Sequence, residues 1–167
     1  MQLKATYSAR EVVVVTGLTA RHLQVWDAGG LLVPAIHPRR TEAGGYTERR
    51  YTPLDVLELL VLADLHHRGF SMAALHAIVV ALKGQFGVRL YDATGGGSPV
   101  RLLTDGEDVY ARAADGTFYN LLKAPTQPLL IAGDEKQLKE VKGKAPRTSR
   151  WASGLGRSSR GRRPAAE

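Results

Sequence analysis

Cysteine is absent from the 167-residue sequence. This excludes a disulfide framework, a metal site built on thiolates and a cysteine nucleophile. Long hydrophobic runs are missing as well, because no stretch approaches the roughly 20 apolar residues that cross a bilayer as a helix. The first six residues, MQLKAT, do not have the pattern of a secretion signal. We therefore expect a cytoplasmic protein without membrane contact.

The residue patterns of enzymes and metal centres are also missing. The histidines have no spacing typical of metal ligands, and the adjacent His66 and His67 diverge by about 100° on a helix. The glycine run at residues 95–97 lacks the Lys-Ser/Thr pair and the following helix of a phosphate loop. No Ser-His-Asp pattern or acid pair has a supporting context. We expect neither catalysis nor a bound metal or cofactor.

The net charge of +7 is distributed unevenly along the chain. Residues 136–167 contain ten basic and two acidic residues, a net charge of +8, which leaves −1 for residues 1–135. The total charge is therefore a poor argument for nucleic-acid binding by the folded part. Such an argument depends on motifs and on local clusters of arginines, here Arg39, Arg40, Arg49 and Arg50.

A short amphipathic helix is predicted in residues 17–32, GLTARHLQVWDAGGLL. The Thr19 hydroxyl is suited to an N-cap, and the two glycines after Ala28 end the helix. At 100° per residue, Leu23 and Trp26 lie on one face, which we interpret as the core face. The opposite face is small, polar and cationic, and consists of Arg21, Gln24, Val25 and Ala28.

A second helix is predicted just upstream. Ser8 and Glu11 have the spacing of a capping box, and four valines follow. Four valines favour a strand, but the capping box and the break at Thr16-Gly17 favour a helix of two turns. Helix, glycine-containing turn and second helix with an exposed polar face form the arrangement that places a helix in a DNA major groove.

These residues resemble the N-terminal domain of MerR-family transcription regulators. The motif is Tyr7-Ser8-x-x-Glu11-Val12-x-x-x-Thr16-Gly17-Leu18-Thr19, followed by Leu23-x-x-Trp26-Asp27-x-x-Gly30-Leu31-Leu32-x-Pro34. The resemblance covers about the first half of the chain. It implies a wing over residues 33–51, a third helix starting at Thr52-Pro53-Leu54-Asp55, and a link into a fourth helix at Gly69-Phe70-Ser71-Met72.

The sequence departs from the family pattern in three places. Gln24 and Val25 replace an arginine and an aromatic residue at positions that face DNA in the family. The return arm of the wing has about two additional residues, Thr47-Glu48. The long dimerising helix expected after the fourth helix is missing from the pattern.

The resemblance implies DNA contacts on the second helix and on the wing, from Thr19, Arg21, His22, Gln24, Val25, Arg39, Arg40, Tyr46, Arg49 and Arg50. Arg21 is either a DNA contact or a solvated arginine. Gln24 has the chemistry to pair with an adenine edge, and Val25 to touch a thymine methyl group, but solvent exposure explains both equally. For the wing arginines we expect phosphate contacts. Of Tyr46 and Tyr51, at least one packs the wing onto the core.

The third helix is predicted over residues 53–68. Its apolar residues spread around almost the whole circumference, so it must be covered from more than one side. Ser71 caps the fourth helix, in which Leu75, Ile78, Val79 and Leu82 keep helical spacing. We expect this helix to end at Gly84.

A β-rich segment follows, over residues 86–135. Strands are predicted at residues 88–91, 100–103, 109–113, 117–120 and 129–132, and turns at residues 95–99, 105–106, 115–116 and 125–128. The turn at residues 114–116 predicts a hairpin. Because so few large apolar side chains are present, we expect this segment to dock on the third helix or to dimerise.

The last segment, residues 136–167, is predicted to be a basic tail that is disordered when unbound, because beyond Val141 it has almost no apolar residues. Its arginines favour a salt-sensitive contact with a polyanion, and a plain solvated end is the alternative.

The sequence thus predicts an α+β chain with a winged helix-turn-helix domain at residues 1–85, the β-rich segment and the tail. The function expected is that of a DNA-binding transcription regulator, located in the cytoplasm and on the nucleoid. The expected partners are double-stranded DNA, a second copy of the chain and RNA polymerase. One alternative is a protein-interaction module that reuses the fold with weakened DNA binding. Another is a small-molecule receptor, for which no residue of the β-rich segment nominates a ligand.

Overall fold

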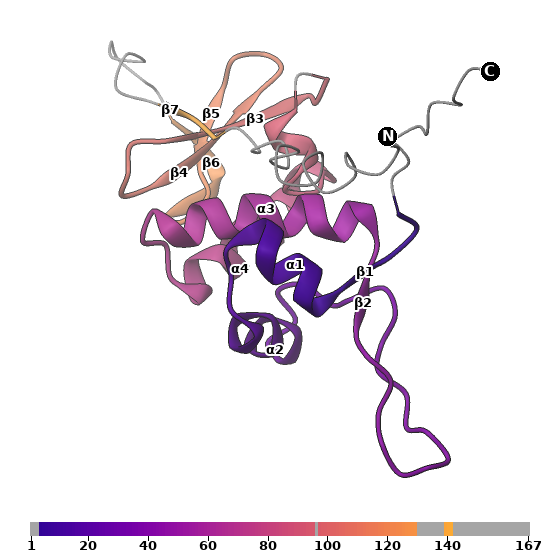
Figure 1. The fold of residues 1–167 in the computed structure, drawn as a ribbon. Coiled ribbons are helices and arrows are strands. Elements are labelled where there is room, and N and C mark those ends of the chain that lie inside the picture. Colours follow the sequence, from indigo (N-terminus) through magenta and orange to yellow (C-terminus); the bar gives the residue numbers. More distant parts are fainter. Residues whose placement is uncertain (1–3, 96, 130–138, 142–167) are drawn as a thin grey trace, which may run out of the picture.

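The computed structural model describes residues 4–95, 97–129 and 139–141 of the chain. It has the predicted α+β architecture, with four helices followed by an antiparallel sheet (Figure 1). Helix α3 (Pro53–His67) runs through the middle, with α1 and α2 below it and the sheet above it in this view. Among the described residues, no helix is both long and apolar enough to span a membrane.

The first two helices form as predicted. Helix α1 (Ala9–Thr16) has a complete capping box, in which the Glu11 amide donates to Ser8 Oγ at 3.3 Å and the Ser8 amide donates to Glu11 Oε2 at 2.9 Å. Gly17 ends the helix in the left-handed conformation, with φ +73°. Helix α2 (Ala20–Ala28) then begins at the N-cap Thr19 and ends before Gly29. The caps outweigh the strand preference of the four valines.

The wing is a long hairpin that projects from the helical part (Figure 1). Its base is the pair of strands β1 (Tyr7–Ser8) and β2 (Arg50–Tyr51), which are antiparallel. Along the arms, Thr47 donates its amide to Arg39 O at 2.8 Å, and its hydroxyl accepts the Arg39 amide at 2.7 Å. At the tip, Gly44 has φ +85°. One of the two additional residues, Thr47, thus holds the arms together.

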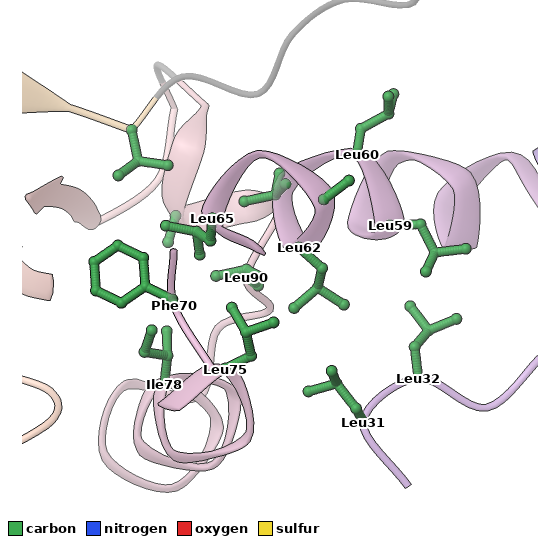
Figure 2. Close-up of a cluster of buried hydrophobic side chains, with 14 of the residues drawn as sticks. Leu31, Leu32, Leu59, Leu60, Leu62, Leu65, Phe70, Leu75, Ile78 and Leu90 are labelled. Carbon is green, nitrogen blue, oxygen red and sulfur yellow. The ribbon is translucent and has the colours of Figure 1, made fainter. Parts of the chain in front are cut away.

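Helix α3 begins with a capping box of Thr52 and Asp55 and ends one residue earlier than expected, at His67. Its apolar side chains are buried nearly all round, as the pattern required. Helix α1, the segment Leu31-Leu32 and α4 (Met72–Ala81) cover part of its surface. The other cover comes from the C-terminal half, so the predicted docking of the β-rich segment on the third helix is confirmed. Figure 2 shows Leu90 beside Leu65 of α3 and Leu75 of α4.

The predicted helix end at Gly84 is wrong. After α4 the chain continues as a wider helical turn, η1 (Leu82–Phe86), and the left-handed Gly87, φ +65°, ends it. The Gly87 amide donates to Lys83 O at 3.1 Å. This extra turn brings the Phe86 ring to 5.4 Å from that of Tyr119 in the sheet. A glycine with an ordinary helical conformation costs some stability but does not stop a helix.

The strand predicted at residues 88–91 is also wrong. The Leu90 and Tyr91 amides donate to the Glu58 carboxylate of α3, at 3.1 and 3.0 Å. A short 3₁₀ helix, η2 (Asp92–Thr94), follows. The backbone donors that a neighbouring strand would have bound are therefore taken by a buried side chain.

The sheet has five antiparallel strands in the order β6-β5-β4-β3-β7. Strands β3 (Val100–Thr104), β4 (Val109–Ala113) and β5 (Phe118–Asn120) lie where the sequence predicted them. The predicted hairpin between β4 and β5 is confirmed by the bond from the Ala113 amide to Thr117 O, 2.8 Å.

Two boundaries differ from the prediction. Strand β6 (Ala124–Leu129) includes the prolines of the expected turn, which is tolerated because β6 is an edge strand. Strand β7 (Lys139–Glu140) pairs with β3, and Val141 is fully buried, so the sheet extends beyond residue 135. Residues 130–132 of the last predicted strand, and residues 142–167 of the predicted tail, lie outside the described residues.

Candidate nucleic-acid interface

Helix α2 presents a small polar face to solvent, as its sequence predicts. Leu23 and Trp26 are each 3% exposed and anchor the helix in the core. Arg21, Gln24, Val25 and Ala28 are all exposed on the other side. The Thr19 hydroxyl accepts the His22 amide at 3.1 Å, which satisfies one of the free N–H groups of the first turn. The first turn contains no acidic residue, so the exposed N-terminal end of α2 favours an anion.

The predicted contact residue His22 has a different environment. Its Nδ1 accepts the Thr19 amide at 3.2 Å, which completes a capping box. Its ring is stacked on Trp26 and lies 4.9 Å from the ring of His66. Burial, followed by the charges of His66 and His67, lowers the pKa of His22. Sequence reasoning missed this role, although Thr followed three residues later by a side chain with an acceptor was the available signal.

Some of the wing residues that were predicted to contact DNA are exposed to solvent. Arg39 and Arg40 are exposed on the outgoing arm, and Tyr46 is 73% exposed near the tip. Tyr51, by contrast, is 1% exposed at the base, so it is the tyrosine that packs the wing onto the core. Arg50 is exposed, and its Nη1 lies 3.5 Å from Thr6 Oγ1.

Arg49 is bound within the protein. Its Nε donates to Asp27 Oδ2 at 2.9 Å and forms an ion pair between the return arm of the wing and the last turn of α2. A carboxylate near a helix C-terminus is disfavoured by the helix dipole, and the arginine offsets that cost. The sequence gives no local signal for this pair, because the two residues are 22 positions apart.

Helix α2 and the wing lie on the same side of the molecule, away from the sheet (Figure 1). Outside the ion pair with Asp27, the wing carries Arg39, Arg40 and Arg50 against Glu42 and Glu48. This arrangement places a helix with hydrogen-bonding side chains next to a cationic arm. Among the described residues, no group of three or more His, Cys, Asp or Glu side chains is placed to hold a metal ion.

Comparison with known proteins identifies this arrangement. Residues 7–82 match the model of the MerR HTH family regulatory proteins. The crystal structure of a transcriptional regulator of the MerR family from Bacillus cereus is similar at 29% sequence identity, with a TM-score of 0.37; the match covers 45% of this chain and 52% of that one. The chain thus matches about half the length of that structure. No curated protein sequence matches the chain. The resemblance predicted for the N-terminal half is confirmed, from β1 to the end of α4.

Proposed function

We infer that residues 7–82, which form a MerR-type helix-turn-helix domain, bind double-stranded DNA, and that the chain regulates transcription. The observation that carries this proposal is the face of α2. Arg21, Gln24 and Val25 are exposed together, while Leu23 and Trp26 fix the helix from behind. A helix anchored on one side and polar on the other is what the major groove accepts.

Base reading is assigned to three side chains of α2. The Arg21 guanidinium can donate to a guanine edge, and the Gln24 amide can pair with an adenine edge. Val25, 44% exposed, matches the size and chemistry of a thymine methyl group. The hydroxyl of Thr19 is occupied by the helix cap, so Thr19 supports the reading face by orienting the first turn.

The wing is assigned to the DNA backbone. Arg39, Arg40 and Arg50 supply charge, and Tyr46 supplies a hydroxyl near the tip. Contacts of this kind set the position and register of a protein on the duplex without reading sequence. Arg49 has a different task in this proposal, because its ion pair with Asp27 fixes the angle between wing and helix.

Two copies of the chain are expected on one operator, since a symmetric site with half-sites one helical turn apart requires two reading helices. In the described part of the chain, α4 is followed by η1, η2 and the sheet, so we propose that the dimer uses another surface than a long helix. Val80 of α4, 57% exposed, and the sheet edges are the available surfaces. To act on transcription, the bound protein must then either contact RNA polymerase at the promoter or exclude RNA polymerase from the promoter.

The experiment that tests the proposal is a genome-wide pull-down of DNA bound to the full chain, followed by binding assays on the recovered duplexes. Enrichment of a symmetric sequence supports the proposal. An absence of any enriched duplex, with a folded protein, contradicts it and favours the alternative of a protein-interaction module. Arg112→Ala is the matched control for variants of α2, because Arg112 is an exposed arginine of β4.

A further inference from the structure

Three histidines from distant parts of the sequence meet beneath the proposed reading helix. His22 belongs to α2, and His66 and His67 are the last residues of α3. The ring centroids of His22 and His66 are 4.9 Å apart, edge to face, and both rings contact Trp26, at 6.1 and 5.7 Å. His67 lies against Gly17, at the turn that precedes α2. The cluster therefore joins the start of α2 to the end of α3.

The hydrogen bond of His22 requires a neutral imidazole. His22 Nδ1 accepts the Thr19 amide at 3.2 Å, and a nitrogen that accepts a hydrogen bond cannot carry a proton. His66 Nδ1 is buried and, within the described part of the chain, makes no hydrogen bond.

We propose that His22 is a positioning residue of α2: its neutral imidazole caps the helix that reads DNA, and protonation of His22 releases the cap and weakens DNA binding. The inference rests on the proposed DNA-binding function and adds its dependence on protons. A positive His22 would lose its bond to Thr19, face the positive end of the α2 dipole and lie beside a second imidazole.

The carboxylates on the elements that pack against His22 have partners of their own. From α3, the titratable groups that face His22 are His66 and His67. The remaining charged groups on α1, α2 and the last two turns of α3 are Arg10, Glu11, Arg21, Asp27, Asp64 and Arg68. Of the three carboxylates, Asp27 and Asp64 pair with arginines at 2.9 and 2.8 Å, and Glu11 is bound at the far end of α1.

The direction of the effect follows from the pKa of His22, which burial and then the charges of His66 and His67 lower below its ordinary value of about 6.5. The neutral form is therefore favoured in the folded protein. Its contribution to stability is present above pH 6.5 and is lost as the pH falls through the lowered pKa. If DNA binding excludes one proton, affinity falls by up to about tenfold per pH unit below that pKa.

The switch itself is tested without DNA. Trp151→Phe leaves Trp26 as the remaining tryptophan of the chain, and its emission reports on the neighbouring imidazoles because a protonated imidazole quenches indole more strongly than a neutral one. His66→Gln removes the other imidazole beside Trp26, which lies 5.7 Å from it. In that background we expect a step in Trp26 emission below pH 6.5 that is absent after His22→Gln. An unchanged step in that variant overturns the inference, whether or not the chain binds DNA.

The link to function is tested on a duplex selected from a randomised pool with the full chain, between pH 5.5 and 8. We expect specific affinity to fall with pH in the wild type and the slope to flatten in His22→Gln, because glutamine accepts the Thr19 amide without titrating. His22→Leu, which packs but cannot cap, should bind more weakly than His22→Gln at every pH. His76→Gln, an exposed histidine of α4, is the control and should keep the wild-type slope.

Two outcomes separate the inference from the function on which it rests. A wild-type slope that persists in His22→Gln, with circular dichroism unchanged over the pH range, overturns the inference and leaves DNA binding intact. Failure to select any duplex at pH 8, with the emission step present, contradicts the proposed function and retains the proton-sensitive cap.

Discussion

Asp27, in the last turn of α2, and Arg49, on the return arm of the wing, form an ion pair at 2.9 Å. The two residues belong to the two parts that are proposed to touch DNA, one in the groove and one along the backbone. Both are shielded from solvent, with side chains 16% and 32% exposed. We propose that the pair sets the angle at which the wing leaves the helix and that Arg49 acts through this contact.

The first prediction separates this role from direct DNA contact. Arg49→Ala and Asp27→Asn should each lower affinity for the specific site, and the double variant should lose little more than either single one. The measurement is a double-mutant cycle of binding at several salt concentrations. If Arg49 instead binds a phosphate, Asp27→Asn should strengthen binding, and Arg49→Ala should reduce the salt slope by about one unit.

The second prediction concerns the reading face. Arg21→Ala should weaken specific binding by about 1–3 kcal/mol and relax the preference at one base pair. The melting temperature should hardly change, because Arg21 is exposed and points away from Leu23 and Trp26. Binding to a mapped site is measured by fluorescence anisotropy, with Arg112→Ala as control. Equal affinity of the wild type and Arg21→Ala would contradict the proposal that α2 binds in the major groove.

The third prediction separates the two basic regions. Residues 142–167 contain eight basic residues and one acidic residue. Their deletion should lower affinity for specific and random DNA alike, and flatten the salt dependence by about one unit per lost phosphate contact. Arg39→Ala with Arg40→Ala should cost the specific site more than random DNA, because the wing sets the register. The measurement is a salt titration of DNA binding for both variants on specific and random DNA. If the deletion abolishes the preference for the specific site and the wing variant keeps it, the two roles are reversed.

The fourth prediction concerns Glu58, which is 6% exposed and accepts the amides of Leu90 and Tyr91. Glu58→Ala should lower the free energy of unfolding by about 2–4 kcal/mol, because it leaves one buried and one partly buried amide donor unpaired. Urea unfolding measures the loss. Glu140→Ala, on the edge strand β7, is the comparison, and an equal loss there would contradict the special role of Glu58.

Glu58 also predicts a pH dependence of stability. Burial raises its pKa above the ordinary value, against the opposing effect of the two amides and of Arg89. The folded protein therefore holds this proton more tightly than the unfolded chain does. Relative to Glu58→Gln, the wild type should lose free energy of unfolding as the pH rises from about 4.5 through the raised pKa. Urea unfolding of both proteins from pH 4 to 7 measures this difference in free energy of unfolding. A difference that grows in favour of the wild type as the pH rises would contradict the prediction.

The fifth prediction concerns assembly. The full chain should be a dimer at micromolar concentration, or become one on DNA that carries two half-sites. Light scattering measures the mass in both states. Val80→Glu, on the exposed face of α4, tests whether that surface is used, and a monomer both on and off DNA would contradict the two-headed arrangement.

The contacts that could be predicted join residues close together in the sequence, and the contacts that were missed join residues far apart in it. The helix starts at Ser8 and Thr19 were predictable, because a cap involves residues three positions apart. The contacts of Asp27 with Arg49 and of Glu58 with Leu90 join residues 22 and 32 positions apart. No local pattern encodes such pairs, and they determine how the wing sits and why residues 88–91 do not form a strand.

One glycine and two prolines were wrongly predicted to end a helix and to form a turn. Gly84 was expected to end a helix, but it lies within the wider turn η1 without a positive φ, and the left-handed position is Gly87. Pro125 and Pro128 were expected in a turn, but they lie in a strand whose outer edge needs no amide donors. In both cases the residue type was compatible with two structures, and packing of the C-terminal half chose between them.

The position of α3 has a consequence for how such chains can be rearranged. Helix α3 packs against the N-terminal helices and also against the C-terminal half. If the chain is divided after α4, each part therefore exposes apolar side chains that are buried in the whole protein. We therefore expect residues 7–82 to lose stability when they are separated from the sheet. Recombination that transplants their DNA specificity onto another effector part must bring the sheet along, or supply a replacement apolar surface for Leu60, Leu65 and their neighbours on α3.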